Sequence, residues 1–397
     1  MFCCFYYTTI FFTIPTIFSL LFLNFNMIIN ISTYERTMYG IMKILIAPDS
    51  YKASLSSNEI CEIFKNTCIN QVITCPLADG GEGTVNAIVS AKKGKFFNSF
   101  VLGPNYNRIN AKYGVIYNNT VVIEVASCCG MTVVEKKNPY FTTTYGLGQL
   151  IRYTLDKGFR NFIIGLGGSC TNDAGLGLLR ALGAKFYDRN RKIIKNARDI
   201  GDIYEIDLNN FDKRVKKSKF LIACDVTNTF TGPNGASFMY GKQKGANDEM
   251  IKKLDSNFSH LEKILNQNLN FLYAGAAGGL GACFKVFFDA KLVRGFDLIT
   301  KMTNLEQKIQ KADLVITGEG RSDIQTKYGK APYGVLKLAK KYNKPVYLIS
   351  GRIEDEEQLK KLSFDKLIEI SPKNINISFA IKNSKKFLIN TIKTLGL

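Results

Sequence analysis

The stretch that decides the fold is Met42-Lys43-Ile44-Leu45-Ile46-Ala47-Pro48-Asp49-Ser50-Tyr51-Lys52. A short apolar run, residues 43–47, ends abruptly in a proline and a polar loop, which is the pattern of a buried strand. The same pattern returns near the other end of the chain, at residues 313–317 and 345–349. Helix-like segments alternate with these runs, so the sequence predicts an α/β protein with a parallel sheet.

The middle of the chain has a different character. From about residue 95, short β-like pieces follow one another up to residue 125, separated by glycine and asparagine turns. Helix-like and strand-like segments then alternate again up to residue 223. We therefore predict a doubly wound domain built from both chain ends, residues 42–90 and 290–397, with a second α/β domain inserted at residues 91–289.

The composition limits the classes of function. The chain has 397 residues, of which 46% are hydrophobic, enough for a buried core in two domains. Lysine and arginine outnumber aspartate and glutamate by 53 to 33, a net charge of +20. These charges are scattered and do not alternate with aromatic residues, so we expect small anionic substrates and no nucleic-acid partner.

Cysteine and histidine restrict the chemistry further. The ten cysteines include no CxxC pair, which disfavours a zinc site, and we expect small buried thiols in a reducing, cytoplasmic compartment. The single histidine, His260, lies in a helix-like stretch and is expected on a helix surface. A Ser-His-Asp mechanism is therefore disfavoured. We expect a carboxylate as any general base, with a lysine, a tyrosine or a thiolate as the alternatives.

The first 41 residues form an apolar extension. Residues 1–34 are mostly apolar and aromatic, and no charge precedes Glu35. The length would cross a bilayer, but Pro15 and three asparagines interrupt it. We favour a start codon placed too early over a membrane anchor. Both interpretations put the beginning of the working protein near Met42.

Five polar, glycine-dense segments follow predicted strands, where the ligands of open α/β sheets gather. The first, Asp49 to Lys52, brings a carboxylate, the Ser50 hydroxyl and an ammonium together, and suits an anion or a metal as well as a capped turn. The second is Asp79-Gly80-Gly81-Glu82-Gly83-Thr84. Its glycines let backbone amides approach an anion, and its two carboxylates would be reconciled with a phosphate by magnesium.

The third segment, Gly167-Gly168-Ser169-Cys170-Thr171-Asn172-Asp173, enters a predicted helix and suits an anion cradle of amides and hydroxyls. Position 170 is cysteine where the dinucleotide fingerprint needs glycine, and no segment matches the P-loop pattern. In the fourth segment, Asp225 follows an apolar run. Partial desolvation there would make its carboxylate a better base.

The fifth segment, Thr317-Gly318-Glu319-Gly320-Arg321-Ser322-Asp323, alternates acidic and basic groups. It suits an ion pair, a metal or bidentate capture of a carboxylate by Arg321. A sixth, uncharged run contains Gly278 and Gly279, and suits either a close backbone approach to a nucleotide or tight helix packing. Together these loops favour phosphoryl transfer, which depends more on positioning and electrostatics than on a special nucleophile.

In chain order, these segments resemble the glycerate kinase family, in particular its type 1 members related to the bacterial glyoxylate-pathway enzymes. The resemblance runs from about Met42 to near the C-terminus and also includes Thr142-Thr143-Thr144-Tyr145-Gly146 and Gln243-Lys244-Gly245-Ala246. It implies a flavodoxin-like domain built from both chain ends, with an inserted domain of restriction-endonuclease-like type. Ala53 and Ala174 stand where the family usually has glycine.

The reaction implied by the resemblance is transfer of the γ-phosphoryl group of ATP to D-glycerate, with Mg²⁺, to give 2-phosphoglycerate and ADP. We expect Asp225 to accept or orient the hydroxyl proton of glycerate. We expect Lys52 and Arg321 to neutralise phosphate or bind the glycerate carboxylate. The expected magnesium ligands are Asp79, Glu82 and Glu319. The other expected contacts to substrate or nucleotide are Asp49, Ser50, Gly80, Gly81, Gly83, Thr84, Gly167, Gly168, Ser169, Thr171, Asn172, Asp173, Gly278, Gly279 and Asp323.

Several alternatives stay open at this point. Asp49, Asp173 and Asp323 could exchange roles with the carboxylates just named. The chain could instead be a kinase for another small hydroxy acid or a sugar, or a nucleotide-binding sensor without catalysis. A membrane-tethered regulator would require residues 1–34 to be retained. The sequence also leaves open whether the chain forms a homo-oligomer.

Overall fold

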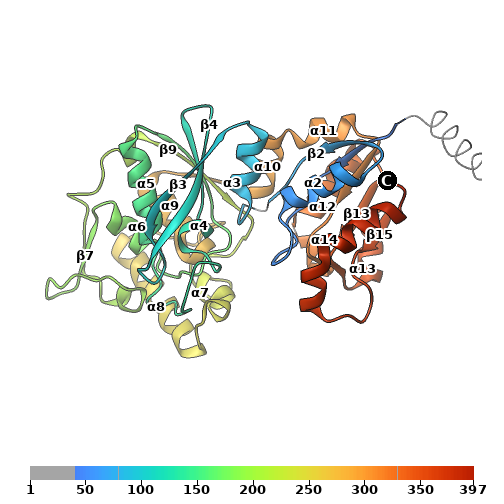
Figure 1. Ribbon diagram of the computed structural model, residues 1–397. Coiled ribbons are helices and arrows are strands. Elements are labelled where there is room, and N and C mark those ends of the chain that lie inside the picture. Colours follow the sequence, from blue (N-terminus) through green and yellow to red (C-terminus); the bar gives the residue numbers. More distant parts are fainter. Residues whose placement is uncertain (1–40, 79, 329) are drawn as a thin grey trace, which may run out of the picture.

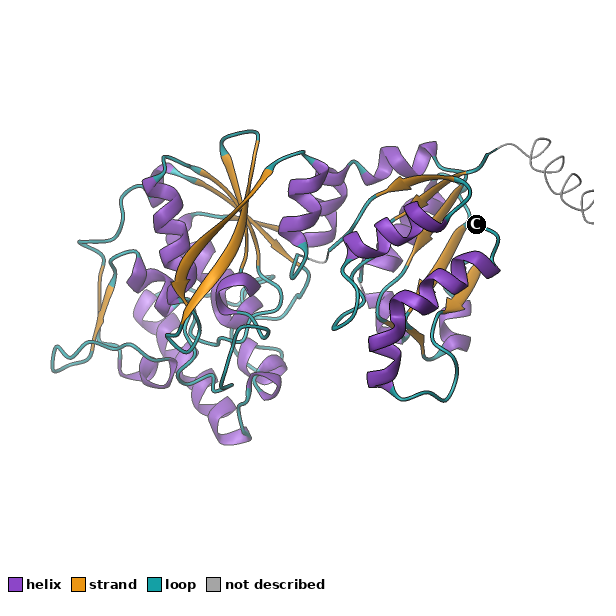
Figure 2. Cartoon of the chain, in the orientation of Figure 1, coloured by secondary structure: helices purple, strands orange, loops and turns teal. Residues whose placement is uncertain are grey.

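The computed structural model describes residues 41–78, 80–328 and 330–397, so the predictions made for residues 1–40 lie outside the described range. Two α/β bodies lie side by side, and each has its own sheet (Figure 1). Both bodies contain helices as well as strands (Figure 2), which confirms the predicted α/β class.

The first sheet has five parallel strands in the order β15-β13-β11-β1-β2. Their bounds are Lys43–Ile46 for β1, Gln71–Thr74 for β2, Leu314–Thr317 for β11, Val346–Ser350 for β13 and Lys366–Glu369 for β15. Strand β1 pairs with β2 on one side and with β11 on the other, so Ile44 faces both Val72 and Leu314. Strands from the two ends of the chain therefore build one sheet.

The second sheet has six strands in the order β10-β9-β6-β5-β4-β3. Their bounds are Lys95–Leu102 for β3, Arg108–Ile116 for β4, Thr120–Glu124 for β5, Asn161–Gly165 for β6, Lys219–Cys224 for β9 and Lys291–Arg294 for β10. Strands β3, β4 and β5 are antiparallel, and β5, β6, β9 and β10 are parallel. Strand β10 lies just past residue 289, where we placed the end of the inserted domain, and it belongs to this sheet.

Helices cover the two sheets. They are α2 (Ser57–Thr67), α3 (Thr84–Ala91), α4 (Ala126–Cys129), α5 (Tyr145–Asp156), α6 (Leu176–Ala181), α7 (Ala236–Tyr240), α8 (Asp248–Leu265), α9 (Ala276–Phe288), α10 (Gly295–Thr303), α11 (Leu305–Lys311), α12 (Ala331–Lys341), α13 (Glu356–Lys360) and α14 (Ile377–Thr394). Two short ribbons complete the fold, β7 (Lys185–Tyr187) with β8 (Glu205–Asp207), and β12 (Arg321–Ser322) with β14 (Arg352–Ile353).

Alternation along β1 explains why this strand is apolar throughout. Ile44 and Ile46 face a core that also contains residues of α2 and α14. Leu45 and Ala47 face the opposite core, with residues of α11 and α12. A parallel strand covered on both faces needs apolar side chains at successive positions, which is the pattern read from residues 43–47.

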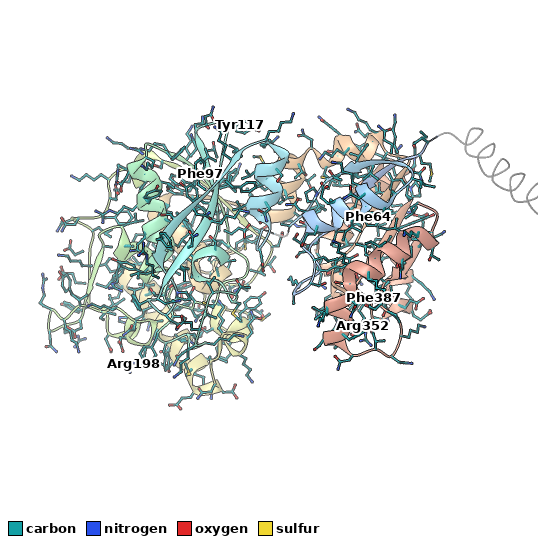
Figure 3. All side chains as sticks on the ribbon, in the orientation of Figure 1. Phe64, Phe97, Tyr117, Arg198, Arg352 and Phe387 are labelled. Carbon is teal, nitrogen blue, oxygen red and sulfur yellow. The ribbon has the colours of Figure 1, made fainter. Side chains whose placement is uncertain are left out.

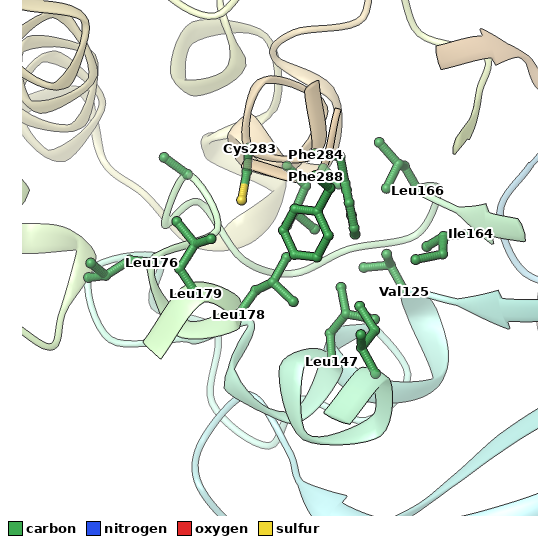
Figure 4. Packing of buried hydrophobic residues seen from close by; sticks show 14 of the residues in the cluster. Val125, Leu147, Ile164, Leu166, Leu176, Leu178, Leu179, Cys283, Phe284 and Phe288 are labelled. Carbon is green, nitrogen blue, oxygen red and sulfur yellow. The ribbon is translucent and has the colours of Figure 1, made fainter. Parts of the chain in front are cut away.

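Helices α3 and α10 join the two bodies. Val85 and Ile88 of α3 and Phe296 of α10 belong to one apolar cluster with Leu45 of the first sheet and Val122 of the second. The remaining core of the second body packs α5, α6 and α9 against its sheet, through residues such as Leu147, Leu178 and Phe284 (Figure 4). One continuous apolar layer thus links the sheets.

Two helix starts are fixed by local hydrogen bonds. The N-cap of α2 is Ser56, whose side chain accepts a hydrogen bond from the backbone of Glu59. Helix α6 begins at Leu176, because Gly175 has a left-handed backbone (φ 77°) and the Asp173 carboxylate accepts hydrogen bonds from the turn that follows it.

The expectations for thiols and histidine are met where they can be examined. The eight cysteines from Cys61 to Cys283 are free, and all but Cys68 are buried. His260 lies in α8, partly buried, with Nε2 2.7 Å from the carbonyl oxygen of Ile203. In the part of the chain that the structure describes, no helix is both long and apolar enough to cross a membrane.

Candidate active site

A cavity of about 570 Å³ opens at the carboxyl edge of the five-stranded sheet. The chain runs from β1 to β2 on one side of β1 and returns later to β11 on the other side, so the loops after β1 and β11 diverge. Such a reversal of strand order leaves a crevice in which open α/β sheets bind ligands. Six predicted site residues line the cavity, namely Asp49, Ser50, Lys52, Glu319, Arg321 and Asp323.

Glycine allows the loop after β11 to fit between its neighbours. A Cβ atom at Gly318 would lie 1.7 Å from the carbonyl oxygen of Ile349 at the end of β13. The Asp49 amide donates to the Gly318 carbonyl at 2.9 Å, and the Arg352 amide donates to the Gly320 carbonyl at 3.0 Å. The loops after three neighbouring strands are therefore bonded to one another at the cavity.

A buried carboxylate and a lysine lie in this wall. Glu319 accepts hydrogen bonds from Thr326 Oγ1 at 2.7 Å and Ser322 Oγ at 3.2 Å. Lys330 Nζ lies 3.2 Å from Glu319 and 3.4 Å from Asp323. Burial raises the pKa of Glu319, and the nearby Lys330 ammonium opposes that rise. Lys330 is a residue of this site that the sequence analysis did not identify.

The other cations of the cavity differ in what they contact. Arg321 is paired with Glu354 at 2.6 Å and lies 3.6 Å from Asp323, although its side chain is 62% exposed. Within the described residues, neither Lys52 nor Arg352 has a carboxylate oxygen within 4 Å. Both side chains are exposed at the cavity, and Figure 3 labels Arg352 on the same body as Phe387 of α14. These two cations are therefore available to an anionic ligand.

The glycine loop after β2 reaches the second sheet. The Gly167 amide donates to the Gly80 carbonyl at 3.1 Å, and a Cβ atom at Gly167 would lie 2.5 Å from the Cα of Gly81. Gly80 also lies against the carbonyl of Ala223 at the end of β9. These glycines serve close packing of backbone on backbone, which the sequence alone did not distinguish from close approach to a ligand. Gly83, Gly168 and Ser169 belong to the same group of loops, and Thr84 is the first residue of α3.

Asp225 lies at this junction, directly after β9. Its side chain is 15% exposed, and Oδ1 accepts from the Phe296 amide at 3.3 Å. Arg294 Nε lies 3.8 Å from the same carboxylate oxygen. Arg294 is the last residue of the four-residue strand β10. The sequence analysis missed this residue because it did not predict the strand.

A second carboxylate at the strand ends was also missed. Glu124 is the last residue of β5, and its Oε1 accepts from the Val85 amide at 2.7 Å at the start of α3. Burial raises the pKa of Glu124 to about 7, although backbone hydrogen bonds from Val85 and Gly83 act in the opposite direction. An acidic residue that ends an apolar run was the signal used for Asp225, and it was equally visible here.

Five predicted ligand contacts instead lie inside the second body. Thr171, Asn172 and Asp173 are fully or almost fully buried. Asp173 accepts from the Thr144 amide at 2.9 Å and from the Gly175 and Gly177 amides. A Cβ atom at Gly278 would lie 2.1 Å from the Thr171 carbonyl oxygen, and one at Gly279 would lie 2.9 Å from the Cα of Ala174. These contacts show tight packing of backbone on backbone, and the assignment of these five residues to a ligand stays a prediction.

Lys244 holds the loop formed by residues 169–171. It is 3% exposed, and its Nζ donates to the Thr171 carbonyl at 2.7 Å and to Ser169 Oγ at 3.2 Å. Burial lowers the pKa of Lys244 to about 8. Lys244 belongs to the segment Gln243-Lys244-Gly245-Ala246, which is part of the family resemblance, but no role was predicted for it.

A short segment after β2 connects the loops at the first sheet with the loops at the second sheet. The Leu77 amide donates to the Pro48 carbonyl at 2.9 Å, next to the cavity, and three residues later Gly80 contacts Gly167. Because an extended chain spans at most about 3.6 Å per residue, Leu77 and Gly80 are separated by no more than about 11 Å. The loops of the first sheet therefore adjoin those of the second.

The predicted magnesium ligands are not gathered in the described residues. Asp79 lies outside them, Glu82 is exposed beside Glu124 at the second sheet, and Glu319 belongs to the cavity of the first sheet. In residues 41–78, 80–328 and 330–397, no group of three or more histidine, cysteine or acidic side chains has the arrangement of a metal site.

The fold and the site define a class of enzyme with two adjoining α/β lobes. A charged cavity lies at the reversal of strand order in one lobe, and the acidic strand end with Asp225 belongs to the other. The sequence profile of the glycerate kinase family matches residues 44–396. Glycerate 2-kinase of Escherichia coli is 43% identical over 79% of this chain and 86% of its own length. Glycerate kinase of Bacillus cereus is 39% identical over 89% of this chain and 97% of its own.

A solved structure agrees with these relatives. A crystal structure assigned to glycerate kinase 2 of Salmonella typhimurium LT2 superposes with a TM-score of 0.75 at 39% identity, covering 90% of this chain and 98% of its own. The chain belongs to the glycerate kinase family.

Proposed function

We propose that this protein transfers the γ-phosphoryl group of ATP to D-glycerate, giving 2-phosphoglycerate and ADP. The observation that carries the proposal is the cavity at the strand-order reversal, where the exposed Lys52 and Arg352 have no carboxylate partner in the described residues. Family membership supports glycerate as the acceptor. Phosphoryl transfer needs cations that position and neutralise the phosphates, and the cavity supplies them.

The roles of the residues follow from their places. Lys52 and Arg352, aided by Arg321, would bind the anionic groups in the cavity. Asp225 would accept or orient the proton of the glycerate hydroxyl from the adjoining strand end. Its carboxylate is largely buried beside Arg294, and a fixed, partly desolvated carboxylate suits a general base.

Magnesium belongs to the same proposal. Mg²⁺ is usually held by one or two carboxylates together with substrate phosphates, and Asp49, Glu319 and Asp323 line the cavity that would receive those phosphates. The fit is therefore better for carboxylates of this cavity than for Glu82. When bound, the ion would neutralise charge on the phosphates.

We also propose the finer classification. Counted along the chain, the first sheet has the strand order 2-1-3-4-5, which is that of flavodoxin-like domains. The second body would be the inserted restriction-endonuclease-like domain, with β10 added to residues 91–289. We assign the protein to the type 1, glyoxylate-pathway group and to the cytoplasm, where its free buried thiols would stay reduced.

The direct test is ADP release from ATP and Mg²⁺ with and without D-glycerate, followed by identification of the phosphorylated position by NMR. We expect ADP only when D-glycerate is present, and 2-phosphoglycerate as the product. Stronger turnover of a sugar or another hydroxy acid would overturn the choice of acceptor. Tight ATP binding with no ADP formed would indicate a sensor and contradict the kinase.

A further inference from the structure

The geometry points to a binding surface for the nucleotide base, formed by α14 and the loop before it, which line the same cavity as the charged groups of the first sheet. The inference rests on the proposed function for the identity of the nucleotide. It assigns ATP to the first sheet and leaves the strand ends of the second sheet to the acceptor.

The surface consists of three isoleucines. Ile375, Ile377 and Ile381 line the cavity, with Ala380 between the last two. Ile377 is 63% exposed and Ile381 is 37% exposed, although both are large apolar side chains. Exposed apolar side chains that gather at a cavity rimmed by polar groups are typical of a binding surface.

The two proposed substrates differ in whether they need such a surface. D-Glycerate consists of a carboxylate, two hydroxyls and three carbons, so it has no apolar face to place against isoleucine. A nucleotide has a flat aromatic base at one end and phosphates at the other. The cavity offers both kinds of surface, because α14 and the segment before it contribute isoleucines, whereas other loops contribute Lys52, Arg321, Lys330 and Arg352. Its volume of about 570 Å³ is within the range of roughly 300–1,000 Å³ found for larger organic ligands.

Hydrogen bonds fix the apolar surface relative to the loop that contains Lys52. Ser54, two residues after Lys52, donates from its Oγ to the carbonyl of Ile381 at 3.2 Å and also contacts the hydroxyl of Ser384. Asn376 caps the start of α14 by accepting from the Ser378 amide at 2.8 Å. The surface is therefore held in place before a ligand arrives, as expected of a preformed site.

The test is the substitution Ile381→Asp, with Phe379→Asp as the matched control. Phe379 is on the same helix and 56% exposed, but it does not line the cavity. The Kd of ATP, measured by equilibrium dialysis, and the KM of each substrate would be compared with the unaltered protein. We expect Ile381→Asp to weaken ATP binding and raise its KM on the order of tenfold, the loss of one apolar contact, with the KM of D-glycerate changed less than about twofold. Phe379→Asp should change neither.

Other outcomes would overturn the inference. Unchanged ATP binding in Ile381→Asp, or a change confined to the KM of D-glycerate, would place the base elsewhere. Equal effects of Ile381→Asp and Phe379→Asp would indicate a general disturbance of α14. Because dialysis needs no turnover, a protein that binds ATP but forms no ADP would refute the proposed reaction while still testing the base surface.

Discussion

The loops at the two sheets look alike in sequence but use their polar residues differently. In the cavity of the first sheet, Lys52 and Arg352 are exposed and have no acidic partner among the described residues. At the second sheet, Asp173 and Lys244 are buried and bonded to neighbouring loops. The first group of loops leaves charge available to a ligand, whereas most of the second group builds a rigid support. Asp225 is the exception, because it lies at the point where the two groups adjoin.

The largest effect should come from replacing Asp225. Asp225→Asn keeps the size of the side chain but removes a proton acceptor, so we expect kcat with D-glycerate to fall by about 10²–10⁴-fold. Asp297→Asn is the control, since Asp297 also lies near Arg294, at 4.0 Å, but is 68% exposed. A fall of less than about tenfold in Asp225→Asn, or an equal fall in both variants, would contradict the role of Asp225 as a base.

A smaller effect should show that Gly278, at the second sheet, is needed for close packing of the backbone. Gly278 and Gly232 both have left-handed backbones (φ 72° and 85°), but a Cβ atom would meet the Thr171 carbonyl at Gly278 and open space at Gly232. Gly278→Ala should therefore lower the free energy of unfolding by about 1–3 kcal/mol more than Gly232→Ala. Urea denaturation would measure both. Equal losses of stability would show that the close packing at Gly278 is unimportant.

A further effect, which depends on pH, concerns Glu124, the buried carboxylate that connects the end of β5 with the start of α3. The pKa of Glu124 is raised from 4.5 to about 7, so between these values the folded state holds a proton that the unfolded state releases. Raising the pH through this window should therefore destabilise the unaltered protein relative to Glu124→Gln, by at most about 1.4 kcal/mol per pH unit. The prediction is wrong if the two proteins keep a constant difference in unfolding free energy from pH 4.5 to 7.

Much of the fold could be predicted because local patterns determine it. The run at residues 43–47 is apolar on both faces, as a central parallel strand must be, and its loop ends in the predicted cavity. Ala53 and Ala174, which stand where the family usually has glycine, both have a positive φ (62° and 47°). Short elements such as β10 were missed, since four residues carry too little periodicity to stand out.

The site was harder to predict because a glycine-rich loop has two physical uses. Gly80 and Gly167 approach each other, and Gly278 approaches Thr171, where a nucleotide was considered instead. Sequence reports only that a Cβ atom is absent, not which atoms fill the space. Arg352 was missed although it follows a strand and a glycine, because the loop after β13 carries no acidic residue at its start.

The most direct measurement is a crystal structure with a non-hydrolysable ATP analogue and D-glycerate. We predict the base against Ile377 and Ile381, the phosphates beside Lys52 and Arg352, and the glycerate 2-hydroxyl within hydrogen-bond reach of Asp225, roughly 2.6–3.2 Å. Two results would contradict the proposal that ATP binds at the first sheet and the acceptor at the second. One is a nucleotide bound only at the second sheet, and the other is an acceptor hydroxyl that reaches Asp225 neither directly nor through one water.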